Sequence, residues 1–450
     1  MTTSRHSLHR TLSTRRRILC AALAAALPFG AQAARLDYDV SMRYMHSDNI
    51  VLQAANEISE DILSPQVRFD LTHDSSVLTT RLRGNVQYLD YMDDVYQDDT
   101  RGEFTGELEW TLLPERLTFY ARDSLSEQSV DSLAAFTPGN QQKINVFEAG
   151  PTLMARFGET MRGVLDLRYT NSWAEETETF NSDRYSAAAR LLRPLSTTDT
   201  LVFNLEAGQT EYDTISEFYN YKRYDAYVTY LSELSKLNLD VSAGYSRLKP
   251  EGADGTSSAL FRGYAGWQVA PRSQLSARAS YQFGDASQDL IQRVGAPGEP
   301  TDPGTPGGPG VGQPGDPNLQ IIPDTFKQKR ASMGYEFTGE RLTLLAEPYV
   351  EQLRYLRDES FDADNSGISV SARYGLTARL SLTGVAQRYK REFTNIDRDD
   401  TDTILGTGLA MRFSRHWGAQ VDYLHRKRNS SISSQDYVEN VVALSVTFYR

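Results

Sequence analysis

The sequence predicts an all-β fold: a transmembrane, antiparallel, up-and-down β-barrel of about 20 strands (roughly 18–22). Three observations predict it. Apolar and polar residues alternate with a period of two along most of the chain, tight turns alternate with long acidic or Gly/Ser-rich loops, and the chain opens on a secretory signal. Short turns at one end and long loops at the other are typical of bacterial outer-membrane barrels.

Residues 1–33 are expected to be a signal peptide that is removed after Ala33. Five arginines lie in a basic segment before an apolar run that starts at Ile18, and Ala31-Gln32-Ala33 fits the small-residue cleavage pattern. The apolar run is shorter than the ~20 residues that a spanning helix needs. The only cysteine, Cys20, lies in this segment, so no disulfide and no cysteine metal site is expected in the mature chain 34–450.

The alternation defines individual strands of about ten residues or slightly more, each with one apolar and one polar face. Clear examples are LDYDVSMRY (36–44), RGEFTGELEWTL (101–112), QLSARASYQF (274–283), GISVSARYGL (367–376) and VVALSVTFYR (441–450). The last strand is expected to pair with the first, because hydrocarbon does not tolerate open sheet edges.

Tight turns and long loops set the predicted strand count. Nine tight turns are expected at 73–76, 113–116, 158–161, 196–199, 232–236, 270–273, 338–341, 375–379 and 414–417. They join eighteen strands in pairs; a first and a last strand bring the count to about twenty, with both ends on the short-turn, periplasmic side. A Pro/Gly-rich extracellular loop is expected at 286–325, because fourteen of the residues 296–317 are Pro or Gly.

The polar face of each strand is expected to line the barrel interior. The candidate lumen-lining residues are Arg43, Arg68, Arg81, Arg83, Glu107, Arg122, Arg168, Arg262, Arg278, Arg330, Arg373 and Arg412. Two interpretations stay open: these charges pair with one another and brace the wall, or they line a conduit for a hydrophilic, acidic solute. The inward tyrosines Tyr120, Tyr212, Tyr227 and Tyr264 are expected to pack against the wall rather than to stack on sugar rings.

Composition and motifs argue against several classes of protein. The mature chain has 42 basic residues (47 less the five in the signal) against 59 acidic ones, a net charge of −17, which argues against nucleic acid as a partner. His73 and Ser75 have the spacing of a barrel phospholipase site, but they fall in a periplasmic turn. No hydrolase, metallopeptidase or nucleotide-binding motif is present, so we expect no enzyme, no metal and no cofactor.

The segments ARLDYDVSMRYMHSDNIVLQ (34–53), LPERLTFYARDSLSEQ (113–128) and VVALSVTFYR (441–450) carry a family resemblance. With them the mature chain resembles the outer-membrane β-barrels encoded with bacterial exopolysaccharide and exosortase-type (PEP-CTERM) systems. The resemblance implies the outer membrane of a Gram-negative bacterium. The implied partners are outer-membrane lipid and lipopolysaccharide, the barrel-assembly machinery, polysaccharide and periplasmic export components.

The expected function is a non-enzymatic channel that takes part in export of exopolysaccharide across the outer membrane. A general diffusion porin and a surface adhesin acting through its loops are the alternatives. No long loop that folds inward as a constriction is expected, which favours export over the porin.

Overall fold

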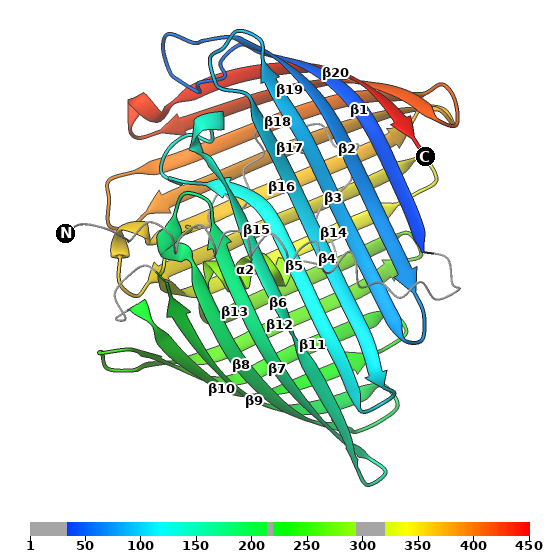
Figure 1. The fold of residues 1–450 in the computed structure, drawn as a ribbon, viewed down its shortest axis with the longest axis vertical. Helices are drawn as coiled ribbons and strands as arrows, with labels where there is room; N and C mark the ends of the chain where they lie inside the picture. The colour runs from blue at the N-terminus through cyan, green and yellow to red at the C-terminus, as the bar shows by residue number, and fades with distance from the viewer. Residues whose placement is uncertain (1–33, 214–218, 294–319) are drawn as a thin grey trace, which may run out of the picture.

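The computed structural model describes residues 34–213, 219–293 and 320–450, which form one sheet of 20 antiparallel strands closed into a barrel (Figure 1). The predicted fold class and strand number are confirmed. The expected signal peptide, and most of the Pro/Gly-rich loop, lie outside the described residues. The strands are β1 (Arg35–Ser47), β2 (Glu60–Asp74), β3 (Leu78–Tyr91), β4 (Asp99–Leu113), β5 (Leu117–Ser129), β6 (Gln141–Phe157), β7 (Met161–Ala174), β8 (Ser182–Pro194), β9 (Asp199–Tyr212), β10 (Tyr221–Glu233), β11 (Leu237–Pro250), β12 (Thr256–Ala270), β13 (Ser273–Asp285), β14 (Thr325–Thr338), β15 (Leu342–Tyr355), β16 (Ala363–Gly375), β17 (Leu380–Phe393), β18 (Asp399–Arg412), β19 (Trp417–Ser430) and β20 (Tyr437–Tyr449).

The barrel closes where the two ends of the sheet meet. Each strand pairs with the next one in the chain, and β20 pairs with β1 along a ladder from Asp39↔Tyr449 to Ser47↔Val441. Beyond this ladder, Tyr38 and Arg450 exchange two more backbone hydrogen bonds, 3.1 and 2.9 Å long. The C-terminal strand is therefore held on both sides, and no edge of the sheet is left open.

The connections differ between the two ends of the barrel. At one end all nine expected turns are found where the sequence places them, and none is longer than four residues. At the other end the connections range from the short loop 251–255 to the long segment 286–324, and they include the helix α2 (Ala286–Arg293) and short 3-10 turns. By this asymmetry, which is typical of outer-membrane barrels, we name the turn end periplasmic and the loop end extracellular.

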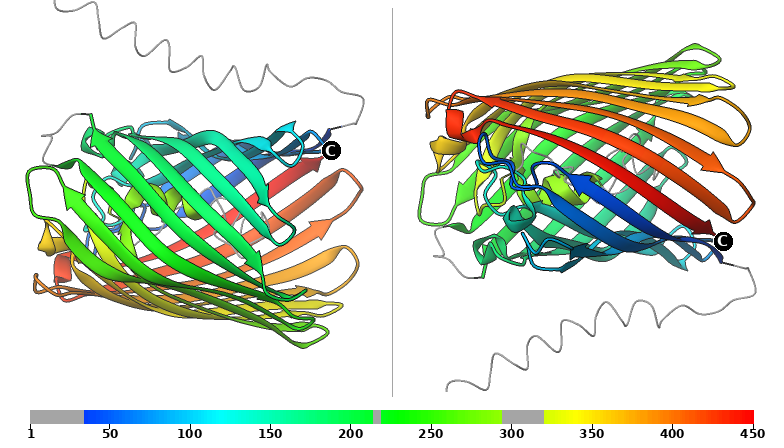
Figure 2. Two further views of the ribbon diagram at one scale, coloured as in Figure 1. Left: turned by 90° about the horizontal axis from the view of Figure 1, so that it is seen from below. Right: turned by 90° about the horizontal axis from the view of Figure 1, so that it is seen from above.

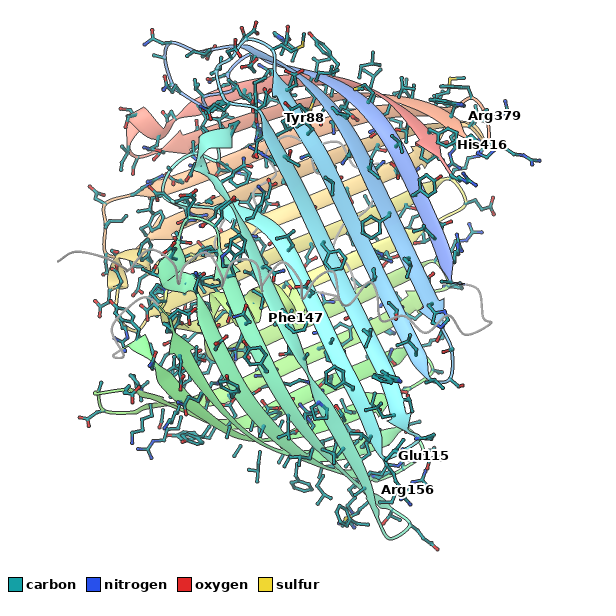
Figure 3. The ribbon with its side chains drawn as sticks, in the orientation of Figure 1. Tyr88, Glu115, Phe147, Arg156, Arg379 and His416 are labelled. Atoms are coloured by element: carbon teal, nitrogen blue, oxygen red, sulfur yellow. The ribbon has the colours of Figure 1, made fainter. Side chains whose placement is uncertain are left out.

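The outer face of the barrel is apolar and exposed. Its side chains include Val40, Leu205, Val228, Met333, Val350, Leu405 and Leu444. Aromatic residues such as Tyr88 and Trp110 lie near the strand ends, where an amphipathic ring matches a membrane–water interface. Tyr88, near the top of the barrel in Figure 3, is one of these, and Phe147 lies on the front wall. Among the described residues, no helix is long and apolar enough to span a membrane.

Gly244 marks a close approach within the wall. It lies on the inner face of β11 directly opposite Tyr227 of β10. A Cβ atom at Gly244 would collide with the carbonyl oxygen of Ala226 and with the backbone of Tyr227. Only glycine fits here without moving one strand against the other.

Replacing Gly244 with alanine is expected to destabilise the barrel by about 1–3 kcal/mol, because the extra methyl group forces a backbone shift in a packed sheet. The measurement is the urea midpoint of tryptophan fluorescence for the barrel refolded in detergent. Gly384→Ala is the matched control, since a Cβ at Gly384 of β17 would meet nothing within 4 Å. Equal losses in the two variants would contradict the steric explanation.

Candidate functional site: the lumen and its loop plug

The structure places all twelve candidate lumen residues on the inner face of the wall. Strand register shows this directly, because Arg81 lies opposite Glu107 and Glu107 lies opposite Arg122, whereas the exposed Trp110 and Val86 alternate with them. The remaining nine occupy the equivalent face of their own strands.

Exposure of these side chains changes along the barrel. The exposed ones, Arg81, Arg83, Arg278, Arg373 and Arg412, all lie in the periplasmic halves of their strands. The other seven are partly buried, and Arg43 and Arg330 lie nearer the extracellular ends. The interior is therefore wettest and most openly charged toward the periplasm; we call this region the vestibule.

Many of the interior charges pair across neighbouring strands. Arg68 lies 2.9 Å from Asp39, Arg122 lies 3.2 Å from Glu107, and Arg168 lies 2.9 Å from Asp166 on its own strand. Arg43 reaches Asp422 at 3.5 Å across the closing seam, and Arg330 reaches Glu351 at 3.2 Å. These contacts fit the interpretation in which the interior charges pair with one another and brace the wall.

The inward tyrosines are engaged by the wall. The Tyr120 ring lies between the guanidinium groups of Arg122 and Arg168, at 5.1 and 5.3 Å from its centroid. Tyr227 and Tyr264 each carry an arginine over the ring in the same way, and Tyr212 packs on a buried cluster at the extracellular end. Each of these rings contacts other side chains of the wall, as expected for residues that pack rather than stack on sugars.

The inner face becomes apolar at the extracellular end, which the alternation did not predict. Inward-facing Met45, Leu89, Ile404 and Val441 form a buried cluster that draws β1, β3, β18 and β20 together. The loop 48–59 completes this cluster from inside the barrel, because Ile50 is only 3% exposed and packs within it. The side chain of Asn49 fixes the loop by donating to the carbonyl oxygens of Gln53 and Val438, both at 2.8 Å.

A second segment crosses the lumen after β13. At its extracellular end β13 leaves its neighbour β12, since their ladder stops at Phe261↔Tyr281 while β13 continues beside β14 to Asp285↔Thr325. The helix α2 follows and lies within the outline of the barrel in each view of Figures 1 and 2. Its residues Ala286, Leu290 and Ile291 pack with Ile144 and Val146 on the inner face of β6. The expectation that no long loop folds inward as a constriction is therefore wrong.

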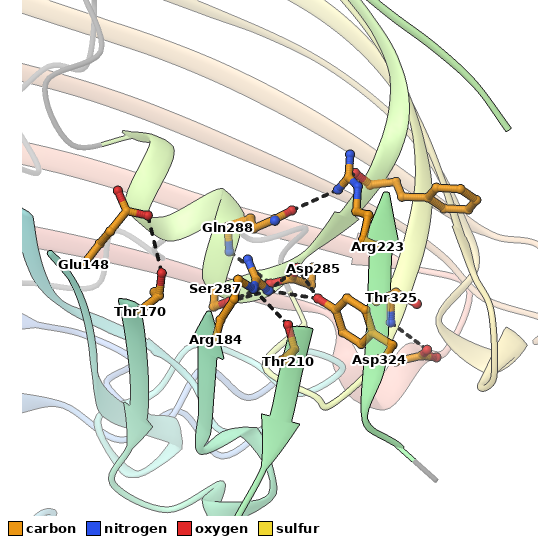
Figure 4. Close-up of polar contacts among 12 residues, drawn as sticks. Glu148, Thr170, Arg184, Thr210, Arg223, Asp285, Ser287, Gln288, Asp324 and Thr325 are labelled. Atoms are coloured by element: carbon orange, nitrogen blue, oxygen red, sulfur yellow. Dashed lines mark hydrogen bonds and ion pairs between the residues drawn. The ribbon is translucent and has the colours of Figure 1, made fainter. Parts of the chain in front are cut away.

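A buried ion pair anchors the start of α2, as Figure 4 shows. Arg184 of β8 lies 2.7 Å from Asp285, and their side chains are 10% and 5% exposed. The same guanidinium group donates to Thr210 and to the hydroxyl of Tyr221, both at 2.9 Å, and Tyr221 donates to Asp285 at 2.8 Å. Ser287 donates to the other carboxylate oxygen at 2.6 Å. Every charge in this network is partnered, so the network specifies one position for the helix.

Arg223 of β10 adds a second tether beside that ion pair. Its Nη1 atom donates to the carbonyl oxygen of Phe283 at 2.9 Å and to the side chain of Gln288 on α2 at 3.1 Å. Because β13 has moved off the wall here, Phe283 is buried against Tyr221 and Leu248. The inward bend is thus packed as well as hydrogen-bonded.

The returning limb, 320–324, meets a third loop over the lumen. The hydroxyl of Ser132, in the loop 130–140, donates to the side chain of Gln320, and Arg391 of β17 donates to the carbonyl oxygen of Ser132 at 3.2 Å. Burial raises the pKa of Asp324, whose carboxylate nonetheless accepts three backbone hydrogen bonds, from Thr325 and from the segment 357–358. We call residues 48–59, 130–140, 286–293 and 320–324 together the loop plug.

The lumen offers no metal site within the described ranges, where no group of three or more His, Asp or Glu side chains is arranged to hold an ion. The expectation of a protein without enzyme activity stays a prediction.

Comparisons with known proteins agree with the architecture. Residues 361–450, which include β16 to β20, match a family described as "Putative beta-barrel porin 2". No curated protein matches the chain. The match covers only the last five strands of the barrel.

Solved structures that are similar to the chain include iron-uptake barrels. The ferric enterobactin receptor PfeA of Pseudomonas aeruginosa matches at 10% identity and a TM-score of 0.49, over 94% of this chain and 81% of that chain. The siderophore receptor PirA from the same organism matches at 14% and 0.42, over 93% and 81%. The FrpB iron transporter of Neisseria meningitidis matches at 8% and 0.45, over 93% and 83%. Similarities this low carry no argument about function.

Replacing Arg184 with methionine is expected to destabilise the protein by about 3–5 kcal/mol, because the Asp285 carboxylate is left buried without its cation. Adding Asp285→Asn should recover part of this loss, since neither charge then remains. The measurement is again the urea midpoint in detergent. Arg83→Met is the control: its pair with Asp70 is 59% and 39% exposed, so its loss should stay below about 1 kcal/mol. Equal losses for Arg184→Met and Arg83→Met would contradict the anchoring role.

Proposed function

We propose that the chain is a gated outer-membrane channel for hydrophilic solutes, and that the solute it passes is an exported exopolysaccharide. One observation carries the proposal. A wet, charged vestibule that faces the periplasm lies beneath an apolar plug that the barrel's own loops form at the extracellular end. A barrel of this size encloses a wide lumen, so the plug decides whether a solute can pass.

The position of the plug supports an outward direction of transport. A polymer that comes from the periplasm would first meet exposed arginines and paired carboxylates, which offer hydrogen bonds to hydroxyl and acidic sugar groups. It would meet the loop plug last. The resemblance of the segments 34–53, 113–128 and 441–450 to barrels of exopolysaccharide systems supports the same substrate class.

The contacts within the plug suggest where it opens. The loop 48–59 packs within one buried cluster, α2 and Ile321 of the returning limb pack within another, and α2 is held by an ion pair besides. The loop 130–140 meets the limb 320–324 through the hydrogen bond from Ser132 to Gln320, and it meets the wall through Arg391 of β17. A neutral hydrogen bond contributes only about 0.5–1.5 kcal/mol, so the joint between Ser132 and Gln320 is the weakest part of the closure.

A diffusion porin is the second candidate, and two observations favour it. The helix α2 has the fixed anchorage of a permanent constriction, and the C-terminal strands match a porin-like family. In this case the plug narrows the channel for small solutes and stays closed during transport. The third candidate, an adhesin that acts through its loops, gains no support from loops that fold inward.

A crosslink between the two meeting loops separates the candidates. Because residues 34–450 contain no cysteine, Ser132→Cys together with Gln320→Cys supplies the only thiols of the barrel. Joined by a disulfide or a short bis-thiol crosslinker, the loops should remain closed. If the chain is an export gate, cells with the crosslinked variant should secrete no exopolysaccharide, and secretion should return when the crosslink is reduced. If the chain is a diffusion porin, its small-solute conductance should be the same with and without the crosslink.

The controls are the single variant Ser132→Cys under the same oxidant, and the amount of folded barrel in the outer membrane. Unchanged polysaccharide secretion with the crosslink fully formed would overturn the gated-export proposal. A deletion strain that secretes normally but loses uptake of small solutes would assign the chain to the porin class instead.

A further inference from the structure

Three cations cluster on the outer face of the barrel at its extracellular end. Lys222 lies on β10, and Arg247 and Lys249 lie on β11. Lys222 alternates with the inward-facing Tyr221 and Arg223, so it points away from the lumen. Strand register places Lys249 directly opposite Lys222, and it places Arg247 two residues below Lys249 on the same face.

This arrangement is unfavourable without an anion. Side chains directly opposite on antiparallel strands have Cβ atoms about 4.5–5.5 Å apart, and like charges in that position destabilise the sheet. Within the described residues, no carboxylate forms an ion pair with Lys222, Arg247 or Lys249. The nearest acidic side chain on β9, Glu211, instead accepts a hydrogen bond from Gln209 at 2.5 Å.

Three other outward cations near the extracellular strand ends have acidic partners from the chain itself. Arg354 pairs with Asp364 at 2.5 Å, Lys143 pairs with Glu175 at 3.7 Å, and Lys390 pairs with Glu392. Lys222, Arg247 and Lys249 differ from these three cations because no carboxylate of the described residues pairs with them.

The level of the cluster identifies that partner. Tyr224 lies directly opposite Arg247 on the same face, and Tyr245 lies two residues below Arg247; the two rings are 48% and 56% exposed, and the apolar Val228 lies further down β10. Aromatic residues of this kind mark the membrane–water interface, so Arg247 stands at this interface and the two lysines stand one step above it. That is the level of the phosphate groups of the outer leaflet.

We propose that Lys222, Arg247 and Lys249 bind the phosphate groups of a phosphorylated glycolipid of the outer leaflet, of the lipopolysaccharide type. Phosphate oxygens satisfy several ammonium and guanidinium donors at once and cancel the repulsion between the facing lysines. A lipid is favoured over free phosphate because the cluster stands directly above exposed apolar side chains, on which acyl chains can lie.

The test compares the purified full barrel with the triple variant Lys222→Gln/Arg247→Gln/Lys249→Gln. The probe is lipid A in mixed detergent micelles, and the readout is the dissociation constant together with the number of lipids retained in native mass spectrometry. Three lost cations at a membrane surface should weaken binding on the order of a hundredfold. The matched control, Lys143→Gln/Arg354→Gln/Lys390→Gln, loses equal charge at the paired sites and should bind like the unmodified chain.

Two further arms identify the source of the phosphate and the occupant. Dephosphorylated lipid A should bind the unmodified chain as weakly as lipid A binds the triple variant, and inorganic phosphate should not compete at the lipid's concentration. Equal binding by both triple variants, or tight binding of inorganic phosphate alone, would overturn the proposal. So would a triple variant that keeps its lipid but falls from dimer to monomer in light scattering, because the cations would then face a second copy of the chain.

Discussion

The pairing of β1 with β20 is the constraint on which the rest of this structure depends. Hydrocarbon offers no partner for a backbone N–H or C=O, so a membrane sheet must close on itself. The ladder from Asp39↔Tyr449 to Ser47↔Val441 closes it, and the final residue, Arg450, still pairs with Tyr38. A closed barrel of twenty strands has a wide interior. Two kinds of structure fill that interior as a consequence: ion-paired side chains toward the periplasm and folded loops at the extracellular end.

The ion-paired side chains and the folded loops differ in whether they leave the lumen open to water. Charges that pair across strands, such as Arg68 with Asp39, brace the wall without blocking the bore, and water still reaches Arg83 and Arg278 beside them. The loops exclude water, because Ile50 and α2 bury apolar surface against inward-facing side chains of the strands. A buried apolar contact is stabilised in proportion to its area and is lost as a unit when its loop withdraws. In the proposed gated channel the plug is therefore the part that moves, and the ion-paired wall of the vestibule stays in place.

Sequence alternation was sufficient for the wall and insufficient for the plug. Turn chemistry and the alternation of apolar and polar residues located the strands, their number and the inward face of Arg81 and Glu107, because the outward face of a strand is apolar where it crosses the membrane. The plug follows from tertiary contacts, which have no period. Its trace in the sequence is local: near the extracellular end of β6 the inward Ile144 and Val146 are apolar, whereas the outward Lys143 and Asn145 are polar. This reversal of the alternation next to a long loop would have indicated that the loop folds over the strand end.

The outer cation cluster and the inner anchor share the same two strands. Lys222 follows Tyr221, whose hydroxyl holds Asp285 inside the barrel, and Lys249 follows Leu248, which packs against Phe283 where β13 bends inward. Repulsion between Lys222 and Lys249 acts on the very strand ends that carry the α2 anchor. An anion bound outside would relieve that repulsion and so favour the paired strands on which the anchor is built. A lipid at the proposed site would therefore favour the closed state of the lumen through β10 and β11, without any contact between lipid and plug.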